Sequence, residues 1–465
     1  MALGKRKLKE QELFIATNQI VRTQAHPFYK KLNQVFDQCG FDDFVEELCE
    51  PYYAKKGRPG IPPGIYFRMI LIGYFEGLDS QRGVAWRCND SLSLREFLGL
   101  DVTEPAPVHA SMTIIRQRLP QKVFDEFFVF VLKQLQENGL VKGKTIGIDA
   151  TTLEANAAMK SLERRADHKD WQEYLEELAK AEGIENPSKE DLQRLDRGRK
   201  KKVSNKEWQS RTDSDSRIGK MKDGRTHMLY KAEHSVDLET EAILNSHVTY
   251  GDRGDTATGP ESVTLTQVNL NELEGDLEVK EVVMDKGYHS TELLAECETW
   301  GLRTYLPEPK RKRRKWRDKA PELERIYRAN RRRAKGTRGK KLNRKRSEYC
   351  ERTFAHVCET GGSRKTWLRG LEHVEKIHSL KCAAFNIGLL MRKVFGLSKP
   401  RNWESSRAAA LAAAFLAAFA SGSVLSGSIN RETGFAITSV AIAVLLLTNL
   451  KIFARRAGFL KNGVY

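Results

Sequence analysis

The sequence predicts a mixed α/β sheet with helices on both faces, preceded by an all-α region. Between residues 11 and 140, apolar residues recur every three or four positions, which is the repeat of an amphipathic helix. After residue 223 the repeat falls to two, as in half-buried strands. Strand-like runs then alternate with helix-like runs, an order that favours a sheet covered by helices on both sides.

The all-α region spans residues 1–140. The predicted helices within it cover 27–40, 64–78, 84–100 and 123–139, and each stops at or near a glycine. A shorter helix in "HASMTIIRQRLP" should end before Pro120 and expose Arg116 and Arg118. A helix-turn-helix and ordinary helix packing both fit this segment.

The second region, 141–398, begins with a strand around Ile146. A charge-rich helical insertion without a large core follows at 160–223. Two runs with a repeat of two, 227–237 and 242–250, read as a hairpin. Four further elements follow in the order helix, strand, helix, strand, at 261–275, 277–290, 291–301 and 302–307, and a helix is expected after them.

Two of these strands are predicted to end on an acid. In "KTIGIDATT" the β-branched run stops at Asp149, and "EVVMDKGYHS" repeats the arrangement with Asp285. An Asp after a strand is often only a turn former. If the two strands are neighbours, however, their carboxylates lie close together, and such a pair is usually stabilised by hard divalent cations with oxygen ligands.

A third acid is expected from the later helix "SEYCERTFAHV", which offers Glu348 and Glu351. At about 100° per residue, Cys350, Phe354 and Val357 define its buried stripe. Glu351 lies at the edge of this stripe and Glu348 lies on the solvent side, so Glu351 is the favoured ligand.

The charge of the chain is concentrated in one segment. The net charge is +18 with a pI near 9.5, and residues 310–346 alone hold 20 Lys or Arg against 3 Asp or Glu. Opposite charges at i,i+4 spacing are largely missing there, so the segment is poorly explained as a solvated helix face. It predicts nucleic-acid binding, in which Arg331, Arg332, Arg333 and Arg346 would take part; the alternative is a disordered basic linker.

The seven cysteines include no C-x-x-C pair, which indicates a reducing compartment and argues against a disulfide framework and a zinc site. The N-terminus has no apolar run long enough for a signal peptide, so a cytoplasmic protein is expected. Residues 399–465 read as a hydrophobic helical tail. Its segments 408–430 and 433–450 carry no charged residue and are long enough to span or nearly span a bilayer, but packing on the core or on a second subunit is favoured over a membrane.

Five blocks of the chain, in order, resemble the DDE transposases of bacterial insertion sequences. The first block, "GIPPGIYFRMILIGYFEGL" with "HASMTIIRQRL", is similar to the family's N-terminal helical domain, and the second, "IGIDATTLEANA", to its first acid motif. The third, "DGRTHMLYKAEHSVDLET", is similar to its second and third strands, and the fourth, "VVMDKGYHS", to its second acid motif. The fifth, "ERTFAHVCETGGSRKTWLRGLEHVEK" with "FNIGLLMRKVFG", is similar to its third acid motif and the helix beyond.

The resemblance implies a ribonuclease-H-like catalytic domain at 141–398 behind a DNA-binding or assembly domain at 1–140. Asp149, Asp285 and Glu351 would bind two Mg²⁺ ions, or Mn²⁺ in their place. The implied activity is cleavage at the ends of an insertion sequence and strand transfer into target DNA, with the terminal inverted repeats and target duplex as partners and a homodimer as the assembly. The sequence departs from one pattern of the broader family, because Ser347 stands where that pattern has Arg.

Several further residues are candidates around these acids. Lys286 could approach the scissile phosphate or be a plain surface lysine, His289 could orient a phosphate or pack in its turn, and Asp255 could support the site or only form a turn. A catalytically inactive, transposase-derived DNA-binding protein is the alternative function. The predicted nucleic-acid-binding residues are Lys286, His289, Arg116, Arg118, Arg331, Arg332, Arg333, Arg346 and Arg352.

Overall fold

The computed structural model describes residues 26–57, 59–198, 204–310 and 320–400, together with Ala16 and Trp316. These residues belong to one compact unit, Met1–Arg401. Beyond residue 400 the predicted tail lies outside the described residues, as do its two uncharged segments. Within the described part, no helix combines the length and the apolar character that crossing a membrane requires.

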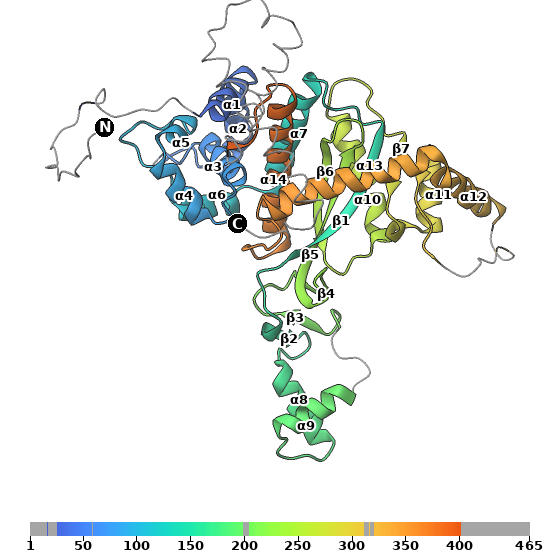
Figure 1. The fold of residues 1–465 in the computed structure, drawn as a ribbon. Coiled ribbons are helices and arrows are strands. Elements are labelled where there is room, and N and C mark those ends of the chain that lie inside the picture. Colours follow the sequence, from blue (N-terminus) through green and yellow to red (C-terminus); the bar gives the residue numbers. More distant parts are fainter. Residues whose placement is uncertain are drawn as a thin grey trace, which may run out of the picture. The chain divides into compact units, whose positions relative to one another are not determined.

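The N-terminal region is helical, as predicted (Figure 1). Helix α3 is apolar around its whole circumference and almost wholly buried, and it ends where Gly77 takes a left-handed conformation (φ 74°). Stacked rings of Phe67 and Phe127, 4.7 Å apart, join α3 to α7. The helices are α1 (Pro27–Gln38), α2 (Phe41–Cys49), α3 (Pro63–Glu76), α4 (Gln81–Asp90), α5 (Leu92–Phe97), α6 (His109–Arg118) and α7 (Gln121–Glu137).

The main sheet is mixed. Its strands follow the order β4-β5-β1-β7-β8, and β6 pairs with β5. The strands β1, β7 and β8 run parallel, whereas β5 is antiparallel to β1, β4 and β6. Their bounds are β1 (Thr145–Glu154), β4 (Arg217–Lys220), β5 (Thr226–Asp237), β6 (Ile243–Tyr250), β7 (Glu281–Met284) and β8 (Arg303–Tyr305). The predicted hairpin is therefore β5–β6.

Helices pack on both faces of this sheet. On β5, Glu233 accepts hydrogen bonds from Thr258 and Ser262 of α10 (Asp255–Asn271). The next residue, His234, instead contacts α13 (Thr337–Phe354) and α14 (Leu371–Lys393). Because successive strand residues point to opposite faces, α10 covers one face, and α13 and α14 cover the other. Helix α11 (Thr291–Thr299) connects β7 to β8.

The charged insertion contains more strand than its sequence pattern predicted. Helices α8 (Trp171–Ala181) and α9 (Lys189–Gly198) share a small core of Leu175, Ala179 and Leu192. A two-stranded sheet, β2 (Leu162–Arg164) and β3 (Trp208–Ser210), accompanies them, and the buried Trp208 packs against Trp171. Near its end, β4 joins the main sheet.

From Pro321 onward the basic segment is helical, which excludes the disordered linker for that part. Helix α12 (Pro321–Lys335) buries Ile326 and Asn330, and the side-chain amide of Asn330 exchanges hydrogen bonds with the backbone of Leu306, just beyond β8. Gly336 separates α12 from α13. A π-helical turn, η5 (Ala355–Glu359), follows α13.

Close packing of α13 on β1 depends on a glycine. A Cβ atom on Gly147 would lie 2.7 Å from Cδ2 of Leu238 and 2.9 Å from Cγ of Arg346. We predict that Gly147→Ala lowers the free energy of unfolding by about 1–3 kcal/mol, because helix and strand must separate to make room. In urea denaturation Gly198→Ala, whose Cβ meets nothing within 4 Å, should stay within about 0.5 kcal/mol of the parent. Equal midpoints for the two variants would contradict this packing.

Candidate catalytic and metal-binding site

The two predicted aspartates stand side by side on neighbouring parallel strands. Strands β1 and β7 pair in the register Ile148↔Met284, so the next position along each strand is Asp149 and Asp285. β7 ends just before Asp285, as predicted. The prediction for β1 was wrong: the strand continues to Glu154, because residues 149–154 pair with β5, and Asp149 lies within it opposite His234.

A single guanidinium lies between the two carboxylates. Nη1 of Arg346, on α13, is 2.8 Å from Oδ2 of Asp149, and Nη2 is 3.6 Å from Oδ1 of Asp285. The Arg346 side chain is 8% exposed, against 25% for Asp149 and 44% for Asp285. A buried cation therefore screens two acids that would otherwise repel each other.

The electrostatic surroundings of Asp149 oppose its ionisation. Burial raises the pKa of this carboxyl above its ordinary value, and the charges of Asp285 and Asp255 raise it further. Arg346 and the hydrogen bond that the Ala150 N–H donates to Asp149 Oδ1 (2.9 Å) act in the opposite direction. Added positive charge at this point would therefore favour the ionised form of Asp149.

A buried network supports the turn that follows Asp285. The carboxylate of Glu233 accepts hydrogen bonds from the hydroxyl of Tyr288 (3.0 Å) and from Lys231 Nζ, 2.8 Å away. Lys231 Nζ also lies 2.7 Å from Oδ1 of Asp255. Burial alone would raise the pKa of Glu233, but Lys231 and the hydroxyl donors outweigh it and hold this pKa below its ordinary value.

This network explains the sequence "DKGY" after β7. A Cβ on Gly287 would come within 2.4 Å of Oδ2 of Asp255, so the 3₁₀ turn η4 (Lys286–Tyr288) needs glycine at its centre. Asp255 therefore supports the site and does more than form a turn. Lys231, Glu233 and Tyr288 were not singled out in the sequence, although two charged residues within the apolar β5 pattern were a usable signal.

The predicted third acid lies on the expected helix. Cys350, Phe354 and Val357 are buried, as the helix phase predicted. Glu351 is more exposed than expected, and its Oε1 accepts a hydrogen bond from Ser347 Oγ (3.1 Å). Burial raises the pKa of the neighbouring Cys350 thiol, and the charges of Asp149 and Glu351 raise it further, whereas Arg346 lowers it. Both carboxylates therefore act on the same buried side chain.

Glu348 is engaged elsewhere. It forms an ion pair with Arg352 (2.6 Å), whose other terminal nitrogen lies 2.8 Å from Glu241. Arg352, a predicted DNA contact, is thus held by two acids of its own chain. The assignment of Glu351 as a metal ligand remains a prediction.

The other predicted DNA contacts fall into different surroundings. Lys286 is exposed beside Asp285. His289 is buried and packs edge-on against the ring of Tyr327, 5.5 Å away. Arg118 is exposed, with its guanidinium over the Tyr53 ring. The expected exposure of Arg116 was wrong: it is 5% exposed, because it stands four residues from the buried Met112 on the packed side of α6.

The three consecutive arginines of α12 point in different directions. Arg331 and Arg332 are exposed, and Arg331 lies 3.5 Å from Glu308. Arg333 turns toward the sheet, where its Nε donates to the carbonyl of Thr304 in β8 (3.0 Å). Burial lowers the pKa of Arg333, and its role in supporting β8 was not foreseen.

The donor set suits a hard divalent cation. Asp149 and Asp285 offer carboxylate oxygens from adjacent strand positions, both are partly exposed, and both already face one shared cation. Among the described residues, no three acids come close enough in this arrangement to hold an ion together. Arg346 would have to leave the carboxylates for an ion to take its place.

Two family models match the chain. One, described as Transposase domain (DUF772), covers residues 16–118, and the other, described as Transposase DDE domain, covers residues 148–387 and thus more than half of the chain. The chain belongs to the DDE transposase family. Its mixed sheet with flanking helices is the ribonuclease-H-like fold expected of that domain. Proteins of this family bind DNA and act in transposition, and they typically use a divalent metal. No curated protein and no solved structure matched the chain.

Proposed function

We propose that this transposase is an active enzyme that cleaves DNA at the inverted repeats of its element with Mg²⁺ and joins the ends to target DNA. One observation carries the proposal: Asp149 and Asp285 occupy equivalent positions on adjacent parallel strands and share one cation. A protein that only bound DNA would have no need of two repelling carboxylates in a partly buried place.

In this proposal Asp149, Asp285 and Glu351 hold the metal. Two bound divalent ions would activate the attacking water or 3′-OH and stabilise the leaving oxygen. Arg346 keeps the aspartates from repelling each other in the metal-free protein. With metal held by the carboxylates, the guanidinium of Arg346 would be available to face a phosphate, a group that Arg binds well. The Glu233 network keeps the turn at Asp285 fixed throughout.

The exposed cations near this site form the proposed DNA surface. Lys286 follows Asp285, and Arg331 and Arg332 lie on the helix that packs beside β8. Such contacts position the duplex and carry no sequence information by themselves. Because two element ends must be paired, we infer a homodimer in the synaptic complex. We also infer, on family grounds, that the protein acts in the cytoplasm.

The role of Glu351 is tested by a matched pair of glutamates on one helix. We predict that Glu351→Gln abolishes Mg²⁺-dependent cleavage of DNA carrying the inverted repeats that flank the gene, yet binds this DNA almost normally, because it loses a metal ligand and no phosphate contact. Glu348→Gln, which loses only the pair with Arg352, should cleave at near the parent rate. Cleavage by Glu351→Gln, or its loss in Glu348→Gln alone, would refute this assignment. No cleavage by the parent protein would leave the inactive DNA-binding alternative.

The DNA surface of α12 is tested by the salt dependence of binding. Each phosphate contact contributes about −0.9 to the slope of log affinity against log salt concentration. Replacing Arg331 and Arg332 with Gln should therefore flatten the slope by about one to two units, measured by fluorescence anisotropy with a duplex of arbitrary sequence. Arg333 is left in place because it supports β8.

The control for this experiment removes two charges elsewhere. Lys122 and Lys133 are exposed on α7, and their replacement with Gln should leave the slope unchanged. If the arginine variant keeps the parent slope, α12 does not follow the DNA backbone.

A further inference from the structure

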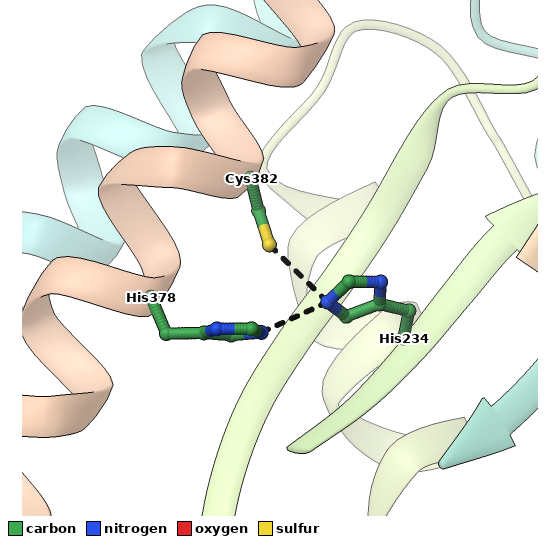
Figure 2. Close-up of side chains that lie close together, drawn as sticks. All are labelled: His234, His378 and Cys382. Carbon is green, nitrogen blue, oxygen red and sulfur yellow. Dashed lines mark hydrogen bonds between the residues drawn. The ribbon is translucent and has the colours of Figure 1, made fainter. Parts of the chain in front are cut away.

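Three buried side chains with nitrogen and sulfur donors meet beneath the sheet. His378 and Cys382 lie four residues apart on α14 and so share one face of the helix, and His234 reaches them from β5 (Figure 2). Their exposed fractions are 0% for His234, 2% for His378 and 0% for Cys382. The three donor atoms all lie within 4.8 Å of one another.

The hydrogen bonds around His234 favour one tautomer. With the Thr353 hydroxyl donating to the Cys350 carbonyl (2.9 Å), its Oγ1 accepts from Nδ1–H of His234 (3.0 Å). The Nε2 atom of His234 then carries a lone pair, which points into the cluster. An imidazole held through its other nitrogen in this way is the usual arrangement of a metal-binding histidine.

The other two side chains converge on this nitrogen. His378 Nε2 lies 2.9 Å from His234 Nε2, and Cys382 Sγ lies 3.4 Å from it. The thiol of Cys382 donates its hydrogen to Ser246 Oγ (3.2 Å). Two nitrogen atoms and one sulfur atom, all able to bind a metal, therefore meet at one buried point.

We propose that His234, His378 and Cys382 bind a Zn²⁺ ion that fastens α14 to strand β5. Two imidazole nitrogens and one thiolate are a donor set that zinc favours and that Mg²⁺ and Ca²⁺, which take oxygen ligands, do not. With Zn–N of about 2.1 Å and Zn–S of about 2.3 Å, tetrahedral geometry separates N from N by about 3.4 Å and N from S by about 3.6 Å. The two separations from His234 Nε2, 2.9 Å to His378 and 3.4 Å to Cys382, reach these values with shifts of about half an ångström or less. The third pair, His378 and Cys382, lies within 4.8 Å.

Binding involves one proton per ion. Burial raises the pKa of the Cys382 thiol, so the metal-free protein holds S–H there. Zn²⁺ forms a bond to the sulfur and the thiol proton leaves to solvent, with no change of oxidation state. Ser246 Oγ, 3.2 Å from the sulfur, can then donate to the thiolate. Of the three side chains, His378 also lines a cavity of about 490 Å³, together with the exposed Trp367, and a water as fourth ligand would come from that side.

The position of the cluster gives the ion a structural role next to the acids. His234 is the direct cross-strand partner of Asp149, so both side chains leave the sheet on the same face. Thr353, which holds His234, stands two residues from Glu351 on α13. An ion here would fasten β5, which pairs with the Asp149 strand, to α14. The hydrogen bond between His234 and Thr353 then ties β5 to α13, which carries Glu351. The zinc assignment does not depend on the proposed cleavage activity.

The test uses the full-length protein and metal analysis. After dialysis against a weak chelator, the parent protein should retain one zinc ion per chain by plasma mass spectrometry. With Co²⁺ substituted for zinc, it should show the thiolate-to-cobalt charge-transfer absorption, which carboxylate sites cannot give. Cys382→Ser should lose the absorption and the retained zinc. Cys358→Ser, which changes another buried thiol outside the cluster, should keep both.

A second variant guards against misfolding of the first. Thr353→Val keeps all three ligands and removes the partner of His234 Nδ1, so zinc affinity should fall by about 10- to 100-fold. Retention of no zinc by the parent, retention of copper in its place, or a cobalt absorption that survives Cys382→Ser would each overturn the proposal.

Discussion

The parallel pairing of β1 with β7 is the constraint on which the site depends. Its register sets Asp149 beside Asp285, and this proximity is unfavourable unless a cation is present. In the structure the cation is the guanidinium of Arg346, brought there by α13 packing against Gly147. The close approach of helix and strand therefore serves electrostatics as well as packing, and in the proposed function the same two carboxylates would hold divalent ions.

Side chains of strand β5 help to position the predicted acids from both faces of the sheet. On one face Glu233 joins Lys231, Asp255 and Tyr288, which fixes the turn after Asp285. On the other face His234 connects β5 to α13 and α14. Buried polar groups of this kind are costly unless every partner is present. The site is thus positioned by two internal networks that differ in chemistry, one of ion pairs and hydroxyl groups and one of imidazole and thiol.

Local patterns predicted the elements of the sheet, but residues distant in the sequence determine how far the strands extend and which side chains meet. The repeated β-branched run before an acid predicted that Asp149 and Asp285 would lie close together if their strands were neighbours, and β1 does pair with β7. The same run did not predict that β1 continues to Glu154, because that part is specified by pairing with β5. Arg346 was predicted as a DNA contact, and its place between acids, one of them 197 residues away in the chain, has no local signature. Likewise no local pattern in the sequence indicated that His234 and His378, 144 residues apart, would meet.

The central claim is that Asp149 and Asp285 form a site for divalent ions that Arg346 fills in their absence. The most direct test is a crystal structure of the protein with Mn²⁺, with the ion located by its anomalous scattering. The account predicts an anomalous peak in contact with both carboxylates and a guanidinium of Arg346 that has moved away from them. Arg346 still bridging Asp149 and Asp285 at saturating Mn²⁺, with no peak between them, would contradict it.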